Sequence, residues 1–245
     1  MTFCEKFRAI LTNPSFLFML FSITFLYFII TGIQYWVSDY LIAVLKVEQK
    51  TVFISFAIVS ITGPVFGVIV GGNVTAYLGG YTSKAALKMT IIFACLCLLT
   101  AAPIAFLSNF PLFLTLLWFL LFFGGFILPC LTGIMLSTVD KHFKTIANSF
   151  ANLIYNLIGY LPAPSVYGAI YDAGDGGNAR EAMATLMFTS FLCVFFLGLA
   201  ATFIVRGDIL KYKKQEEEAE MVDSELRQLA LAKEISERSG ASPND

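Results

Sequence analysis

One uncharged run in the sequence sets the fold class of the chain. The 51 residues from Met89 to Val139 contain no charged side chain. A transmembrane helix needs about 20 apolar residues, so this run is too long for one crossing of a bilayer. The tetrapeptide SNFP at 108–111 interrupts it, and such residues are typical of a tight turn. The run therefore predicts two membrane helices joined by a short connection.

The rest of the chain has the same character. Hydrophobic residues make up 58% of it and charged residues only 13%. Soluble domains, by comparison, are about 25% charged. We expect an all-α membrane protein built as a bundle of six transmembrane helices. The six apolar stretches are residues 14–37, 52–73, 89–108, 111–136, 145–171 and 182–205. The expected organisation is an interfacial segment at 1–13, the bundle at 14–206, and a cytoplasmic charged tail at 207–245, helical and then disordered.

The positions of the lysines and arginines predict the orientation of the bundle. If the N-terminus is cytoplasmic, the cytoplasmic side holds ten of them near the membrane and the opposite side only three, Lys46, Lys50 and Arg180. The ten are Lys6, Arg8, Lys84, Lys88, Lys141, Lys144, Arg206, Lys211, Lys213 and Lys214. We therefore expect a multi-pass integral membrane protein with both termini in the cytoplasm.

Polar side chains form a stripe on each of two apolar stretches. An α-helix advances about 100° per residue, which puts Tyr27, Thr31 and Gln34 on one face of the first stretch. The same geometry aligns a polar stripe on the fifth stretch, comprising Asn148, Asn152, Tyr155 and Asn156. Amides in hydrocarbon need hydrogen-bonding partners, so these stripes should face protein or an aqueous path. Hydrogen bonding between helices and the lining of a cavity both remain open for them.

Glycines at intervals of four predict close packing of the second stretch against another helix. Gly63, Gly67 and Gly71 lie on one face, where small residues allow two backbones to approach. The third and sixth stretches carry only Thr, Ser and Cys as polar residues. Hydroxyls that bond to their own helix tolerate lipid contact, which suits peripheral positions.

The sequence carries no pattern of an enzyme or a metal site. No Asp, Glu, Lys, Arg or His lies in the middle of any stretch, and HExxH and GxSxG motifs are absent. Four of the five cysteines lie in apolar runs, where they act as small hydrophobic residues. We expect no catalytic residue, no cofactor, no metal ion and no nucleic-acid partner.

Three motifs make the chain resemble the C-terminal six-helix half of a major facilitator superfamily transporter. The first is GPVFGVIVGG at 63–72, followed by a loop with Gly79, Gly80, Tyr81 and Lys84. The second is VDKHFK at 139–144 followed by ANS at 147–149. The third is the series Asn156, Gly159, Pro162, Pro164, Gly168 and Asp172. The last two resemble most the spinster-like carriers and the organic-anion transporting polypeptides. The chain departs from the family at Ala76 and Tyr77, where the loop motif has Asp and Arg.

The resemblance implies a role for each stretch. The first and fourth would line a central cavity, the second and fifth would contact the other half, and the third and sixth would be supports. Tyr27, Thr31 and Gln34 would then touch solute together with Thr115, Trp118 and Phe122. The asparagine stripe would lie between the halves or at the cavity edge. Gating and close packing would involve Gly63, Gly67, Gly71, Pro129, Gly159, Pro162 and Pro164.

We therefore expect a transporter, or half of one, that moves an organic or lipid-like solute by alternating access. Its partners would be the bilayer, the solute and a second six-helix half, which is another chain, a second copy or a missing N-terminal half. The alternative function is that of a half-transporter without transport activity, which serves as a membrane subunit or interaction protein. The chain as a fragment of a longer transporter is the third possibility.

Overall fold

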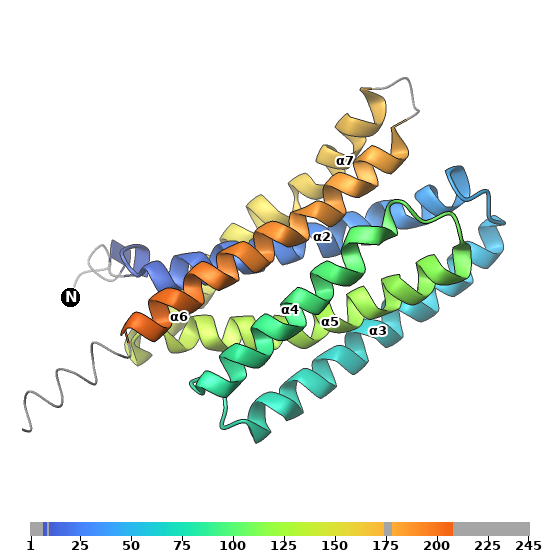
Figure 1. Cartoon of the computed structure of the whole chain (residues 1–245). Helices are drawn as coiled ribbons and strands as arrows, with labels where there is room; N and C mark the ends of the chain where they lie inside the picture. Colours follow the sequence, from blue (N-terminus) through green and yellow to red (C-terminus); the bar gives the residue numbers. More distant parts are fainter. Residues whose placement is uncertain (1–6, 9, 174–177, 208–245) are drawn as a thin grey trace, which may run out of the picture. The chain divides into compact units, whose positions relative to one another are not determined.

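Long helices dominate the computed structural model, which describes residues 7–8, 10–173 and 178–207. Five helices are long and apolar enough to cross a membrane: α2 (Pro14–Ala43), α3 (Gln49–Tyr77), α4 (Lys84–Ile104), α5 (Phe110–Ser137) and the helix Ala179–Gly207. No strand occurs in the described ranges. The chain divides into two compact units, Met1–Ala201 and Thr202–Asp245, and the second is described only over residues 202–207. These helices support a multi-pass integral membrane protein with an all-α fold (Figure 1).

Three of these helices begin where a polar side chain caps the first turn. The side chains of Asn13, Ser83 and Asn109 accept hydrogen bonds from the backbone N–H groups of Phe16, Ala85 and Leu112. Such caps satisfy donors that have no partner within the helix. The predicted break between the third and fourth stretches is confirmed, because α4 ends at Ile104 and α5 begins at Phe110. The turn itself lies at residues 105–106, and Phe110 and Pro111 of the predicted turn already belong to α5. The helices run beyond most of the predicted limits, except that α4 ends at Ile104, before the predicted limit of 108.

The predicted fifth stretch is helical but divided. It consists of α6 (Lys144–Ile154), the π-helix η2 (Tyr155–Tyr160) and α7 (Pro162–Asp172), preceded by the short 3₁₀ helix η1 (Lys141–Phe143). Pro162 has no N–H to donate to the preceding turn, and the Leu161 N–H donates to the Asn156 carbonyl at 3.0 Å. A π-turn of this kind often marks a functional position in a helix. A sixth crossing by residues 145–171 stays a prediction.

The helices pair in a regular order. α3 packs most extensively against α5, while η2 and α7 pack against α2. α4 also packs on α5, where the rings of Phe93 and Phe126 stack with centroids 3.7 Å apart. The helix Ala179–Gly207 contacts α2, because the Ser22 hydroxyl donates to the Cys193 carbonyl at 2.9 Å. Figure 1 shows α3 and α5 running side by side, with α4 next to α5.

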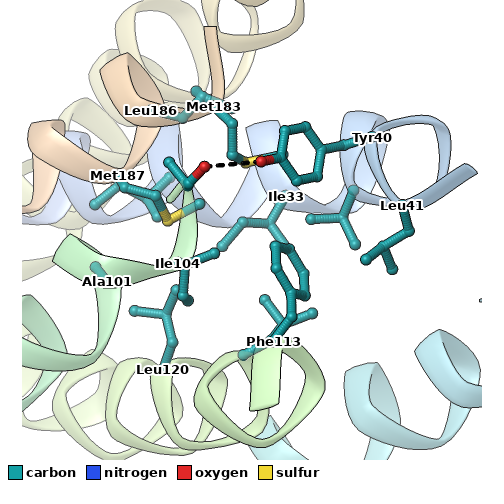
Figure 2. Packing of buried hydrophobic residues seen from close by; sticks show 14 of the residues in the cluster. Ile33, Tyr40, Leu41, Ala101, Ile104, Phe113, Leu120, Met183, Leu186 and Met187 are labelled. Atoms are coloured by element: carbon teal, nitrogen blue, oxygen red, sulfur yellow. Dashed lines mark hydrogen bonds between the residues drawn. The ribbon is translucent and has the colours of Figure 1, made fainter. Parts of the chain in front are cut away.

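A hydrophobic cluster joins α2, α4, α5 and the helix Ala179–Gly207. It includes Ile33, Ile104, Phe113 and Met183, all of them fully or almost fully buried (Figure 2). Tyr40 lies in the same cluster and is 1% exposed. Its hydroxyl donates to the carbonyl of Ala105, the C-cap residue of α4, at 2.8 Å. Tyr40 thus satisfies one of the carbonyls left without a partner at the end of a helix.

Tyr40→Phe should lower the unfolding free energy by about 1–2 kcal/mol, because the buried Ala105 carbonyl loses its donor. The measurement is denaturation in mixed detergent micelles, followed by circular dichroism. Tyr35→Phe is the matched control, since Tyr35 is 63% exposed and its hydroxyl makes no hydrogen bond within the described residues. Equal stabilities for the two variants would contradict the role assigned to Tyr40.

Two predicted regions, the interfacial segment and the charged tail, lie largely outside the described residues. Of the interfacial segment at 1–13, Phe7, Arg8, Ile10 and Leu11 are helical. The predicted tail at 207–245 lies outside the described residues except for Gly207.

Candidate functional site

A cavity of about 150 Å³ lies between α2, α3 and α5. Its wall is mostly apolar, with polar atoms from Tyr27, Gln34 and Ser60. Small-molecule sites are commonly apolar hollows with a few polar groups that fix the orientation of the ligand. The cavity is therefore the candidate binding site of the chain.

Among the residues that the structure describes, the Gln34 amide is the polar group of this cavity without a hydrogen-bond partner. Gln34 is exposed, and its side chain makes no hydrogen bond with any residue that the structure describes. It lies nine residues before the end of a helix of membrane length. A primary amide carries two N–H donors and one carbonyl acceptor, so it can bind either kind of polar group. At membrane depth these atoms need a partner from water, a ligand or another protein segment.

Tyr27 connects the cavity to the divided fifth stretch. Its ring stacks on that of Tyr155 in η2, with centroids 4.4 Å apart and ring planes 3° from parallel. Gly159 lies against the same part of α2, where an added Cβ would come within 2.5 Å of the Thr24 carbonyl oxygen. The π-turn therefore packs directly behind one wall residue of the cavity.

Thr31 lies on the predicted stripe but does not line the cavity. It is 4% exposed, and its hydroxyl donates to the Tyr27 carbonyl at 2.8 Å. A threonine hydroxyl that bonds to its own helix can be buried without any other partner. Only Tyr27 and Gln34 from this predicted set reach the cavity wall.

The face predicted on the fourth stretch also lies away from the cavity. The Trp118 indole donates to the Thr62 hydroxyl at 3.0 Å, and Phe122 stacks on Trp118 with ring centroids 5.4 Å apart. The Thr115 hydroxyl donates to the Pro111 carbonyl of its own helix. The wall is instead formed by Leu121, Gly125 and Leu128. At about 100° per residue their face is roughly a quarter turn from the predicted one.

The second stretch contributes a row of wall residues that sequence reasoning missed. Phe56, Ser60, Pro64 and Val68 line the cavity at intervals of four. This row is adjacent to the glycine row on α3, and the polar Ser60 and the helix-bending Pro64 were the available signals.

The glycine row itself lies against α5. Gly63, Gly67 and Gly71 are buried, and an added Cβ at Gly71 would lie 2.9 Å from Phe126 Cα. From the opposite helix, a Cβ on Gly125 would lie 2.6 Å from the Pro64 carbonyl oxygen. The backbones of α3 and α5 therefore touch, which fixes two walls of the cavity relative to each other.

The asparagine stripe satisfies part of its own hydrogen bonding. The Asn152 amide donates to the Asn148 carbonyl at 3.0 Å, and the Asn156 amide donates to the Asn152 carbonyl at 2.7 Å. Asn148 and Asn152 are half-buried, whereas Asn156 is exposed. Their side chains do not line the cavity.

The predicted prolines have different surroundings. Pro129 lies inside α5, and Pro162 begins α7 immediately after η2. The Pro164 carbonyl accepts a hydrogen bond from the Trp36 indole at 3.0 Å, which ties α7 to α2.

A scan against protein-family models gives no match to this chain. A search of curated proteins likewise finds no similar sequence.

Proposed function

We propose that the chain is a transmembrane carrier, or one half of one, that moves an organic or lipid-like solute by alternating access. The observation that carries the proposal is the cavity between α2, α3 and α5, whose mostly apolar wall includes the Gln34 amide, a group without a hydrogen bond among the described residues. The apolar part of an amphipathic solute would contact Ile30, Ile33 and Phe56. A polar group of the same solute would bond to Gln34, as in other sites where few polar groups orient a ligand.

The order of helix pairing supports a transporter fold. If the six predicted stretches are numbered along the chain, the second packs on the fourth and the fifth on the first. The third packs on the fourth, and the sixth contacts the first. Adding three to each number, and counting on from one after six, turns the pair of the second and fourth into that of the fifth and first. It likewise turns the pair of the third and fourth into that of the sixth and first. Two three-helix repeats of opposite orientation give this pattern, and such repeats are common in secondary transporters.

The resemblance to the major facilitator superfamily supports the same proposal. In that family the first and fourth helices of each half line the central cavity, and Tyr27 and Gln34 come from the first stretch here. Six crossings with cytoplasmic termini, and a second six-helix half opposite the cavity, belong to the proposal. The half would be supplied by a second copy, another chain or an N-terminal region.

Transport should depend on the Gln34 amide. The test uses proteoliposomes that contain the purified full chain, with a fluorescent lysolipid and a fluorescent organic anion as separate probes. We expect Gln34→Ala to lower the initial rate of uptake about tenfold, which corresponds to the loss of one or two hydrogen bonds to a buried ligand.

Asn73→Ala is the matched control for this assay. Asn73 is another amide on a membrane helix, but it is exposed, donates to its own helix at the Ile69 carbonyl, and does not line the cavity. Its replacement should leave uptake unchanged. Uptake of neither probe, or the same rate for Gln34→Ala as for the original chain, would refute the proposal.

A membrane subunit without transport activity is the second candidate. The exposed Asn156 of η2 favours it, because its side-chain carbonyl accepts no hydrogen bond among the described residues and it lies among exposed apolar residues. Lipid cannot donate to this carbonyl, whereas a protein partner within the membrane could. Folded chain that binds neither probe and moves neither across proteoliposomes would favour this candidate over the carrier.

A further inference from the structure

A second cavity lies near the end of α2, apart from the candidate transport site. Its volume is about 190 Å³, and it is lined by Trp36, Asp39, Tyr40, Tyr167 and Tyr171 together with two alanines. It shares no residue with the first cavity. Four aromatic rings and one carboxylate therefore surround a space smaller than the usual pocket of about 300–1,000 Å³ for a drug-sized ligand.

The aromatic wall is held in place by ring stacking between α2 and α7. Trp36 stacks on Tyr167 with centroids 4.7 Å apart and ring planes 18° from parallel. Tyr167 stacks in turn on Tyr171, with centroids 6.4 Å apart. Tyr40 and Tyr167 are only 1% and 2% exposed, so packing fixes their positions. The surface open to a ligand comes mainly from the half-buried Trp36 and Tyr171 and from the exposed Asp39.

Internal hydrogen bonds use up three of the donors in this wall. The Trp36 indole donates to the Pro164 carbonyl, the Tyr40 hydroxyl to the Ala105 carbonyl, and the Tyr167 hydroxyl to the Ala179 carbonyl at 3.5 Å. An indole N–H is donor only, and a hydroxyl that already donates can only accept further bonds. The groups left to a ligand are mainly the electron-rich phenol oxygens, aromatic rings and Asp39 carboxylate, together with the Tyr171 O–H, which donates to no described residue.

Among the residues that the structure describes, Asp39 has no partner of opposite charge. It is exposed, and within the described residues its carboxylate makes no ion pair and accepts no hydrogen bond. Arg180 follows the wall residue Ala179, and its guanidinium donates to the neutral Ser108 hydroxyl at 3.0 Å. It keeps its positive charge and acts electrostatically on Tyr40, but it makes no ion pair with Asp39. The carboxylate is thus free to pair with a cation that enters the cavity.

We propose that this cavity is a binding site for an organic cation, in particular a substituted ammonium group. Cations are attracted to the faces of Trp and Tyr rings, and aromatic enclosures of this type bind quaternary ammonium ligands. Asp39 adds the opposite charge, while the spent donors disfavour an anion. The size suits a headgroup or a small free cation, and the acyl chains of a lipid would remain outside. This site goes beyond the proposed transport function and does not depend on it.

Titration of the full chain with tetramethylammonium tests the site. The protein is kept in a maltoside detergent, which carries no ammonium group, and sodium chloride of equal ionic strength is the blank. The chain has two tryptophans, so Trp118→Phe leaves Trp36 as the sole indole reporter. We expect a saturable change in Trp36 fluorescence, and matching heat in calorimetry with the unsubstituted chain.

Asp39→Asn should weaken tetramethylammonium binding about tenfold, in line with the loss of a charge that reinforces a cation–π site. Asp172→Asn is the matched control, because Asp172 is also exposed and follows Tyr171 but does not line the cavity. It should bind as the original chain does. Trp36→Leu should abolish binding, and circular dichroism shows whether that variant is folded.

A further comparison identifies the source of the cation. The full chain is placed in nanodiscs of phosphatidylcholine or of phosphatidylglycerol, and its binding of tetramethylammonium is measured in each. Weaker binding in one lipid means that this lipid competes with tetramethylammonium. Competition by phosphatidylcholine alone supports the site and assigns it to a lipid headgroup, and a lack of competition by either supports it as a site for a free cation. A non-saturable response, unchanged binding by Asp39→Asn, or equal weakening by Asp172→Asn overturns the proposal. None of these results depends on uptake, so failure here is distinct from failure of the transport assay.

Discussion

Gly67→Ala is expected to lower the unfolding free energy by about 2–3 kcal/mol, at the upper end of the usual cost of overpacking. The new methyl group would overlap the Phe122 carbonyl oxygen and lie 2.9 Å from the Phe126 backbone nitrogen. Both are backbone atoms of α5, which cannot rotate away as a side chain can. The two helices must separate, so the walls of the cavity between them move as well. Denaturation in mixed micelles measures the loss of stability.

Gly72→Ala makes the same chemical change at a position further along α3. An added Cβ there meets nothing within 4 Å. Its effect should be neutral or slightly stabilising, since alanine favours a helix over glycine by up to about 1 kcal/mol. If Gly67→Ala is as harmless as Gly72→Ala, α3 and α5 are not in backbone contact at Gly67.

Gly159→Ala is expected to lower the unfolding free energy by about 2 kcal/mol, a typical cost of overpacking. The added Cβ would lie 2.5 Å from the Thr24 carbonyl oxygen and 3.3 Å from Tyr27 Cβ. The change should push η2 away from α2 and open the stack of Tyr27 on Tyr155. Transport should fall together with stability, since Tyr27 is a wall residue of the cavity. Thermal unfolding in detergent and the uptake assay measure the two effects.

Gly168→Ala is the control for this second change. It lies on the same segment, but its Cβ would meet only the Trp36 ring at 3.6 Å, an ordinary van der Waals distance. Stability within about 0.5 kcal/mol of the original chain is expected. If Gly159→Ala is equally harmless, η2 does not approach α2 as closely as the structure indicates.

The long helices could be predicted from the sequence because each depends on local properties. Apolar stretches of membrane length predicted α2, α3, α4, α5 and the helix Ala179–Gly207. Asn109 illustrates the boundaries, because the SNFP tetrapeptide that contains it predicted the break between helices where Asn109 caps α5. Spacing likewise placed Gly63, Gly67 and Gly71 on one face, although it could not reveal that α5 is the helix they contact.

The cavity wall could be predicted only in part, because it depends on how each helix is rotated in the bundle. Trp118 belongs to the predicted solute-binding face, yet its indole donates to the Thr62 hydroxyl. Leu121 and Leu128 resemble any other apolar residue in the sequence, and only the packing of α3 on α5 turns them toward the cavity. Sequence patterns give the faces of a helix but not the neighbour of each face.

The fifth stretch shows a different limit, because its stripe was drawn on a straight α-helix. Its buried positions Ala147, Ala151, Gly159, Ala163 and Tyr167 lie at multiples of four residues. On a regular α-helix each step of four drifts by about 40°, so Ala147 and Tyr167 would lie on nearly opposite faces. The π-turn holds one residue more than an α-helical turn, so it removes about 100° of this accumulated drift. Most of the buried row therefore lies toward one side of the segment.

The same π-turn has a consequence for sequence alignment. A wide turn adds one residue without adding a turn, so it is equivalent to a single-residue insertion between Ile154 and Pro162. Homologues whose corresponding helix is regular are expected to be one residue shorter at this point. An ungapped comparison would then shift every residue of either α6 or α7 by one position. Alignments of this chain should therefore allow a one-residue gap within Tyr155–Tyr160, inside a segment where gaps are normally penalised.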